Sequence, residues 1–437
     1  MNVLERCFHL EAMNTTAKRE MLAGLTTFMA MSYILFVNPD ILSAAGMDKG
    51  AVFVATALTA LVGCLIMAFF ANWPVGIAPA MGDNAFFAFS VVIGMHILWP
   101  TALAAVFIAA VLFAILTATR VRAMIIDDIP HDLKLAMAAG VGLFIAFIGL
   151  QGGGIIVKDP ATLVALGPIA GKTWITVFGF LVTIVLVLRK VPGAIFIGMI
   201  LTAIFAAIFG WVPVPHHIVS SIPSLKPIFA VSLGHLAEVH TLRLWSIVLM
   251  FLIIAFFDTT GTLVGLGEQA GFSKNNKIPG MGKALGADSG AMVVGTILGS
   301  TPASAYIESS TGIAVGGRTG LTALTIAVLF FLSLFFSPLL SVITGYVTAP
   351  ILVVVGVLMA STLKDIDWKR FEIAVPAFLT VLVMPLTFNI AYGIGFGLVT
   401  YPVTMIAAGK GRQVTPLMYV LAAVFILLFG LFSTVGR

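Results

Sequence analysis

Three acidic side chains stand inside long apolar runs of the sequence. Asp83, Asp258 and Glu308 each lie near the middle of such a run. A carboxylate at the centre of a bilayer costs about 2.5–3.5 kcal/mol on the insertion scale, so such residues are candidates for function. In a sheltered site a carboxylate can carry a proton or accept hydrogen bonds from a ligand. The sequence therefore predicts a wet, polar cavity inside a membrane protein.

Neighbouring residues add amide, hydroxyl and aromatic groups to these positions. An amide offers a donor and an acceptor, and aromatic rings stack on flat heterocycles. The candidate substrate-binding residues are Glu308, Asn84, Asp258, Thr259, Phe86 and Phe87. The candidate proton carriers are Asp258, Glu308 and Asp83.

Each candidate also has a structural interpretation. A helix end or backbone amides can satisfy a buried carboxylate that binds no ligand. Asn84 could cap a following half-helix, and Phe86 or Phe87 could simply pack among the 34 phenylalanines. The histidines lack metal-ligand spacing, and neither H-E-x-x-H nor G-x-S-x-G occurs. We therefore expect no metal, no cofactor and no enzymatic activity.

The composition excludes a soluble globular protein. Of 437 residues, 60% are hydrophobic and 9% are charged, and the mean hydropathy is +1.14. Soluble domains carry about 25% charged residues. Because a spanning helix takes about 20 apolar residues, the hydropathy pattern predicts an all-α protein with about fourteen spans. These lie near residues 20–37, 51–71, 75–95, 100–118, 134–150, 172–189, 192–211, 244–265, 284–300, 303–318, 320–337, 345–360, 372–388 and 390–408.

The spans predict one membrane domain over residues 20–411, after a cytoplasmic segment of residues 1–19. Residues 412–437 form a C-terminal apolar segment and tail, in which 415–433 is either a fifteenth span or an interfacial helix. Most of the 23 Lys and Arg residues fall in loops on the same side as the N-terminus, which predicts a cytoplasmic N-terminus. This loop-by-loop distribution argues against a nucleic-acid partner.

Two segments interrupt the uniform apolar pattern. Residues 74–89 and 300–317 each combine Pro, Gly, small residues and a carboxylate at membrane depth. Irregular backbone is tolerated there only where protein or a water-filled cavity satisfies its polar groups. Interrupted segments at corresponding positions of two halves point to the binding site of a transporter.

Internal duplication is a further expectation from these segments. A shift of 225 positions takes Asp83 to Glu308 and Gly46 to Gly271. Each half has seven predicted spans, an odd number, so the second copy would enter the membrane from the opposite side. The inverted repeats cover about residues 20–211 and 244–408.

Several long strings resemble the AzgA-like purine permeases, a branch of the nucleobase–cation symporters. The strings are AGLTTFMAMSYILFVNPDIL, APAMGDNAFFAF, FFDTTGTLVG and AYIESSTGIAVGGRTGLTA. The likeness runs from about Arg19 to Gly411. The string WKRFEIAVPAFLTVLVMPLTF resembles the hypoxanthine/guanine permeases of this family, and the adenine branch is also close.

The resemblance implies fourteen spans as two inverted repeats of seven, divided into core and gate domains, often as a homodimer. It implies short extended stretches at broken segments 3 and 10. It also implies that Asn84, Asp258 and Glu308 match positions implicated in purine binding or proton coupling. Asp83 departs from the family pattern, in which an apolar or small residue usually precedes the NAFF string.

The resulting hypothesis is a cell-membrane symporter that imports a purine base with a proton by alternating access. Glu308 would accept hydrogen bonds from purine N–H groups, Asn84 would address a carbonyl or ring nitrogen, and Asp258 would hold the proton. The alternatives are a transporter of another nucleobase or of a small organic anion on the same fold, and a channel.

Overall fold

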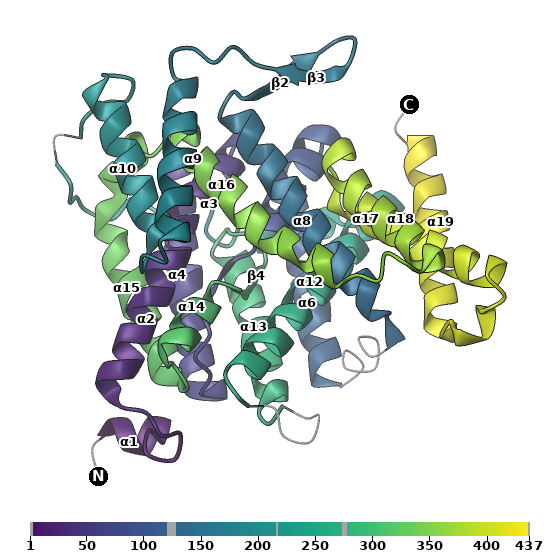
Figure 1. Cartoon of the computed structure of the whole chain (residues 1–437), viewed down its shortest axis with the longest axis horizontal. Helices are drawn as coiled ribbons and strands as arrows, with labels where there is room; N and C mark the ends of the chain where they lie inside the picture. The colour runs from purple at the N-terminus through teal and green to yellow at the C-terminus, as the bar shows by residue number, and fades with distance from the viewer. Residues whose placement is uncertain (1–2, 120–127, 216, 273–277, 436–437) are drawn as a thin grey trace.

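The computed structural model describes residues 3–119, 128–215, 217–272 and 278–435. Its helices form two packing groups (Figure 1). In the first group, α15 packs against α2 and α4, α13 packs against α4 and α6, and α12 packs against α6. The members of this group are α2 (Ala17–Met31), α3 (Ile34–Ala44), α4 (Lys49–Ile66), α6 (Trp99–Ala118), α12 (Leu242–Gln269), α13 (Met281–Ile297) and α15 (Gly320–Ser333).

In the second group, α8 packs against α16 and α17, α9 packs against α10 and α16, and α18 packs against α17 and α19. Its members are α8 (His131–Gly152), α9 (Thr173–Leu188), α10 (Ala194–Ile208), α16 (Gly345–Ala360), α17 (Phe371–Thr387), α18 (Ile390–Ala407) and α19 (Pro416–Val435). Short helical pieces complete the chain: α1 (Val3–Phe8), η1 (Met67–Ala71), α11 (Val231–Gly234), η3 (Leu236–Glu238), η4 (Leu334–Ser341), η5 (Ser361–Asp365) and η6 (Gly411–Gln413).

The predicted polytopic membrane architecture is confirmed at this level. Eight helical stretches of the described residues are long and apolar enough to cross a membrane, the longest being Ala17–Ala44 and Leu242–Gln269. Shorter apolar helices such as Thr173–Leu188 and Ala194–Ile208 accompany them. Polar N-caps begin several helices. At α4, for example, Oδ1 of Asp48 accepts a hydrogen bond from the amide of Ala51.

The two interrupted segments meet inside the first group. Strand β1 (Ile77–Pro79) pairs antiparallel with β4 (Ala303–Ala305), with Ala78 opposite Ser304. After β1 the chain continues into α5 (Met81–Ala85) and η2 (Phe86–Gly94), and after β4 it continues into α14 (Ser309–Val315). The extended stretches that the family resemblance implied at the two broken segments therefore pair with each other, although they are far apart in the sequence.

A small residue allows β1 to lie against helix α4. An added Cβ at Gly63 would stand 2.7 Å from Cγ2 of Ile77 and 3.1 Å from Cβ of Ala291. The next residue, Cys64, hydrogen-bonds both backbone groups of Ile77 through its sulfur, at 3.2 Å to the amide and 3.4 Å to the carbonyl. These contacts satisfy part of the strand backbone that no helix would satisfy.

A β-hairpin joins α8 to α9 and was not predicted from the sequence. Strands β2 (Ile156–Asp159) and β3 (Leu163–Leu166) pair antiparallel. In Figure 1 this hairpin lies at the opposite end of the molecule from α1. Oδ1 of Asp159 accepts from the amides of Ala161 and Thr162, which closes the turn.

The C-terminal apolar stretch forms one helix, α19, packed against α18. The close approach depends on Gly395, where an added Cβ would stand 2.4 Å from the ring of Phe425. In Figure 1 the end of α19 lies toward the same end of the molecule as the β2–β3 hairpin.

Candidate functional site

Hydrogen bonds fix the two broken segments to each other beyond the strand ladder. The amide of Ala80 donates to the carbonyl of Pro302 at 2.8 Å, and the amide of Tyr306 donates to the carbonyl of Gly76 at 3.0 Å. The hydroxyl of Tyr306 donates to the carbonyl of Pro79 at 2.5 Å. The segments therefore form one unit that carries residues of both halves of the chain.

Two aspartates from neighbouring helices hold strand β4. Ser304 donates its hydroxyl to Oδ2 of Asp258 on α12 at 2.7 Å, and the amide of Ala305 donates to Oδ1 of Asp288 on α13 at 3.0 Å. Asp258 was predicted, but Asp288 was missed, although it lies inside a predicted span. The burial argument that singled out Asp258 applies equally to Asp288, which is fully buried.

Glu308 lies immediately before α14 and is 7% exposed. The hydroxyl of Tyr33 donates to its Oε1 at 2.7 Å. Tyr33 stands where the first span breaks between α2 and α3, so its side chain comes from a third element of the same helix group. Sequence reasoning missed this tyrosine because a single aromatic residue in an apolar run gives no signal of its own.

Asn84 and Asp83 lie in the short helix α5 and are buried. Asn84 does not cap this helix, whose N-cap is Ala80; its Oδ1 accepts instead from the hydroxyl of Thr301, just before β4. Asp83 is 1% exposed, and its Oδ1 finds no hydrogen-bond partner within the described residues. Asn84 therefore links α5 to the residues just before β4.

The predicted carboxylates come together in space. Helix α12, which carries Asp258, packs against α5, which carries Asp83, against β4 and against α14, which Glu308 directly precedes. Thr259 is buried beside Asp258. Asp83, Asp288 and Glu308 are buried and Asp258 is partly exposed. The role of the predicted carboxylates in binding or proton coupling stays a prediction.

The two phenylalanines after Asn84 are fully buried. The ring of Phe86 packs edge to face against Phe251, with ring centroids 5.0 Å apart. This geometry agrees with the packing interpretation for Phe86. Contact of Phe86 or Phe87 with a substrate stays a prediction.

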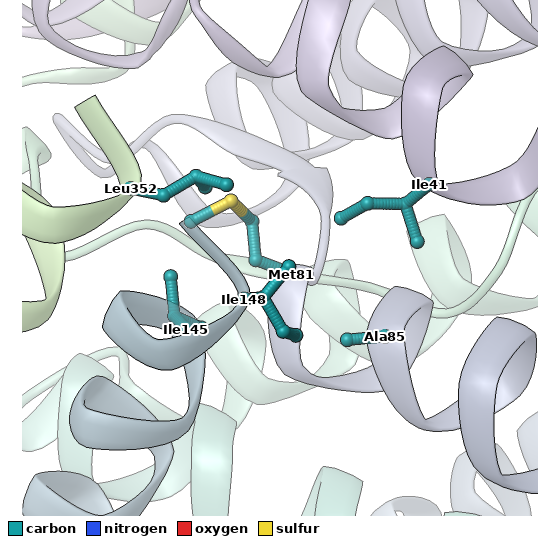
Figure 2. Close-up of a pocket in the computed structure, with 6 residues that line it drawn as sticks. All are labelled: Ile41, Met81, Ala85, Ile145, Ile148 and Leu352. Atoms are coloured by element: carbon teal, nitrogen blue, oxygen red, sulfur yellow. The ribbon is translucent and has the colours of Figure 1, made fainter. Parts of the chain in front are cut away.

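A narrow apolar gap, too small to hold a water molecule, adjoins α5 (Figure 2). Its walls come from both helix groups, with Ile41 on α3 facing Leu352 on α16 across it. The remaining lining residues are Met81, Ala85, Ile145 and Ile148. The cavity expected from the sequence was polar, whereas this one is apolar and lies beside the carboxylate cluster.

Arginines bind the far ends of both half-helices. Nε of Arg19 donates to the carbonyl of Val315 at 3.2 Å, at the end of α14. Nη2 of Arg243 donates to the carbonyl of Met95 at 2.5 Å, just after η2. A cation at a helix C-terminus compensates both the unpaired carbonyls and the helix dipole.

Glu20 shows that a buried carboxylate here can be structural. Its side chain is fully buried and accepts from the amides of Arg318 and Thr319, at 2.9 and 3.1 Å, and from the hydroxyl of Thr322 at 2.6 Å. These donors are the N-cap Thr319, the residue before it, and Thr322 in the first turn of α15. Nη1 of Arg318 meanwhile donates to carbonyls at the end of α14.

The fold and the paired broken segments are those of a membrane transporter. The structure is similar to the transmembrane domain of the bicarbonate transporter BicA of a cyanobacterium, with a TM-score of 0.62 and 16% sequence identity, covering 90% of this chain and 97% of that one. At this identity the likeness defines the fold alone.

The sequence places the chain in a family. Residues 18–396 match the permease family, and the chain belongs to it. It is 50% identical to the guanine/hypoxanthine permease PbuG of Bacillus subtilis, covering 97% of this chain and 98% of the relative. It is 42% identical to the adenine permease AdeP of Escherichia coli, covering 97% and 95%. The chain is therefore a multi-pass membrane permease and not an enzyme.

Proposed function

We propose that this permease imports purine nucleobases together with protons, with hypoxanthine and guanine favoured and adenine as a further substrate. The observation that carries the proposal is the cluster of Asn84, Asp258 and Glu308 around the β1–β4 ladder. The names of the relatives at 50% and 42% identity, guanine/hypoxanthine permease and adenine permease, support the substrate class.

The chemistry of a purine fits these groups. A purine base presents ring N–H donors and acceptors on one flat aromatic system. Glu308 would accept from the N–H groups with the carboxylate oxygen that Tyr33 does not use, and the side chain of Asn84 would meet a carbonyl or ring nitrogen. Amides at the starts of the broken helices add further donors.

Proton coupling is assigned to the carboxylates. Several acidic groups lie close together in a sheltered site, and the arginines Arg19, Arg243 and Arg318 are engaged with backbone carbonyls away from it. Protonation of Asp258 or Glu308 relieves the repulsion among these carboxylates when substrate binds. The same excess of negative charge disfavours a small organic anion as the substrate.

Alternating access follows from the two helix groups. The first group, with the broken segments, acts as the core domain, and the second acts as the gate domain. Ile41 and Leu352 face each other across the boundary, where the groups separate or approach as the site opens to either side. A homodimer as the working form also belongs to this proposal, as the family resemblance implied.

The layout of fourteen spans in two inverted repeats of seven belongs to this proposal, with the N-terminus in the cytoplasm. Two observations support the repeat. Gly46 and Gly271, matched by the shift of 225 positions, follow the first span of each half with positive φ angles of 89° and 75°. Arg19 and Arg243, near the start of those helices, bind the ends of corresponding half-helices.

Uptake measurements test the function. Cells that lack their own purine permeases are supplied with the gene and given labelled hypoxanthine, guanine or adenine, with and without an uncoupler. We expect saturable uptake that falls when the proton gradient collapses, and loss of uptake in Glu308→Gln. Glu268→Gln, at an exposed glutamate of α12, is the matched control. Uptake unchanged by the uncoupler contradicts symport, and normal uptake by Glu308→Gln contradicts the site.

A further inference from the structure

Phe388 stands at the short turn between α17 and α18 in a backbone conformation that is unusual for its type. Its φ angle is 53°, in the left-handed region that a bulky residue rarely adopts. Hydrogen bonds fix the turn, because the amide of Asn389 donates to the carbonyl of Met384 at 3.1 Å and Oδ1 of Asn389 accepts from the amide of Tyr392 at 3.2 Å. Glycine is the usual residue at such a helix end, so a phenylalanine here points to a use for its ring and carbonyl.

The ring and the carbonyl of Phe388 both contact the first helix group. The hydroxyl of Ser90 on η2 donates to the carbonyl of Phe388 at 2.5 Å. The ring of Phe89 packs edge to face against the ring of Phe388, with centroids 5.8 Å apart. Within the second group, the ring of Phe144 on α8 meets the same ring edge to face at 5.7 Å. Phe388 therefore joins the broken segment of the first group to the second group.

The element that carries Ser90 is unusual as well. The stretch η2 (Phe86–Gly94) is a π-helix, a rare conformation that is frequent at functional sites. The amide of Met95 donates to the carbonyl of Ser90, five residues back, at 3.0 Å. Because η2 continues directly from α5, which carries Asn84, the contact with Phe388 lies on the same broken segment as the proposed purine site.

The boundary between the two groups beside α5 is apolar. An added Cβ at Gly82 would stand 3.2 Å from Cδ1 of Ile390. Apolar surfaces can slide past each other without losing a directional bond, whereas a hydrogen bond holds one arrangement. The bond between Ser90 and Phe388 therefore fixes the two groups relative to each other. The narrow gap in this boundary is lined by Ile41, Met81 and Ala85 of the first group and by Ile145, Ile148 and Leu352 of the second.

We propose that Ser90 and Phe388 form a latch that holds the core domain to the gate domain on the η2 side of the purine site and opens in each transport cycle. The inference rests on the proposed alternating access. With the N-terminus in the cytoplasm, the third span runs outward, so η2 faces the outside. The latched structure is then closed to the outside, and the latch sets how often the site opens to that side.

Ser90→Ala removes the hydrogen bond of the latch. One hydrogen bond shifts an equilibrium by about 2- to 12-fold, so the ratio of open to latched molecules should rise by that factor. The matched control is Ser333→Ala. Ser333 is 7% exposed, as Ser90 is, and its hydroxyl donates at 2.6 Å to the carbonyl of Phe330 within α15. This control loses a bond of the same kind without touching the boundary.

Phe388→Leu removes the ring contacts of the latch. Aromatic pairs contribute to an equilibrium on the same scale as one hydrogen bond, so a shift of similar size is expected. Its matched control is Phe178→Leu. Phe178 is half-buried like Phe388, and its ring stacks on Phe205 with centroids 4.0 Å apart, inside the second group.

Hydrogen exchange of the purified protein in detergent measures the opening of the latch. Ile390 and Ala391 begin α18, where the helix offers their amides no carbonyl, and the two residues are 0% and 1% exposed. Exchange at residues 387–391, corrected for intrinsic rates, therefore reports how often the boundary opens. We expect it to be about 2- to 12-fold faster in both latch variants and unchanged in both controls.

Uptake into cells shows whether the latch belongs to the transport cycle. At hypoxanthine concentrations well below KM, the rate depends on the fraction of carriers open to the outside. At equal amounts of protein in the membrane, Ser90→Ala should therefore take up hypoxanthine about 2- to 12-fold faster than Ser333→Ala.

Three results overturn the latch. They are an unchanged exchange rate in Ser90→Ala or in Phe388→Leu, an equal acceleration throughout α9, which means general loosening, and faster exchange without faster uptake. A wild type that takes up no labelled purine overturns the proposed function instead, while the exchange rates still decide on the latch.

Discussion

The hydrogen bond between Tyr33 and Glu308 offers a sharp test of the binding site. The Tyr33 hydroxyl lies 2.7 Å from Oε1 of a glutamate that is 7% exposed. Tyr33→Phe removes the donor with little change of shape and leaves Oε1 to find another. A hydrogen bond to a charged group contributes about 1.5–3 kcal/mol, and every 1.4 kcal/mol is tenfold in affinity. We therefore expect purine binding to weaken by about 10- to 100-fold.

The assay is equilibrium binding of labelled hypoxanthine to purified protein, together with the thermal unfolding midpoint. The matched control is Tyr419→Phe, because the hydroxyl of Tyr419 donates at 3.2 Å to the carbonyl of Gly411 in an exposed turn. This control should bind like the wild type. Adding Tyr33→Phe to Glu308→Gln should cost much less than it does alone, since the two groups act together.

Two results refute the reasoning. Binding by Tyr33→Phe within twofold of the wild type means that the hydroxyl does not orient the carboxylate for the substrate. Full additivity of the two substitutions means that Tyr33 acts on binding by a route other than Glu308.

Two further predictions concern the packing of α4 against strand β1 and the hydrogen bonds of Glu238 outside the membrane-spanning helices. Gly63→Ala places a Cβ 2.7 Å from Cγ2 of Ile77, so overpacking should destabilise the protein by about 1–3 kcal/mol and lower its thermal unfolding midpoint. Gly290→Ala, whose added Cβ would have its nearest neighbour 3.7 Å away, is the control and should keep the wild-type midpoint. Equal midpoints for the two variants contradict this prediction. Hydrogen bonds with Thr101, the larger effect, and with His235 lower the pKa of the Glu238 carboxyl below its usual 4.5. These hydrogen bonds therefore stabilise the fold fully above pH 4.5, and this stabilisation is lost as the pH falls through the pKa of Glu238 in the folded protein. Hydrogen exchange at residues 236–241, corrected for intrinsic rates, should rise on acidification in the wild type but not in Glu238→Gln, and equal profiles contradict this.

The sequence predicted the broken segments because Pro, Gly and a carboxylate at membrane depth have few explanations in a bilayer. The same reasoning identified Asp258 and Glu308, because the free-energy cost of placing a carboxylate at membrane depth follows from the sequence alone. It did not separate functional from structural burial. Glu20 caps α15 and Asp288 holds Ala305, and both tasks depend on backbone amides that only the fold brings into range.

Contacts between distant parts of the chain could not be predicted from the sequence. Tyr33 and Glu308 are 275 positions apart, and a tyrosine in an apolar run is as consistent with packing as with a polar partner. The β2–β3 hairpin was missed because its turn depends on one side chain, Asp159, binding two following amides. Local propensity carries little information where a few hydrogen bonds decide the conformation.

The arginine contacts run crosswise between the two halves. Arg19 comes from the first half and binds the end of α14 in the second, while Arg243 comes from the second half and binds the carbonyl after η2 in the first. A polypeptide of half the length would carry both an arginine and an interrupted helix, yet it could unite them only by pairing with another copy of itself. Under the proposed inverted repeat, these two contacts within one molecule correspond to those that two half-length copies would exchange.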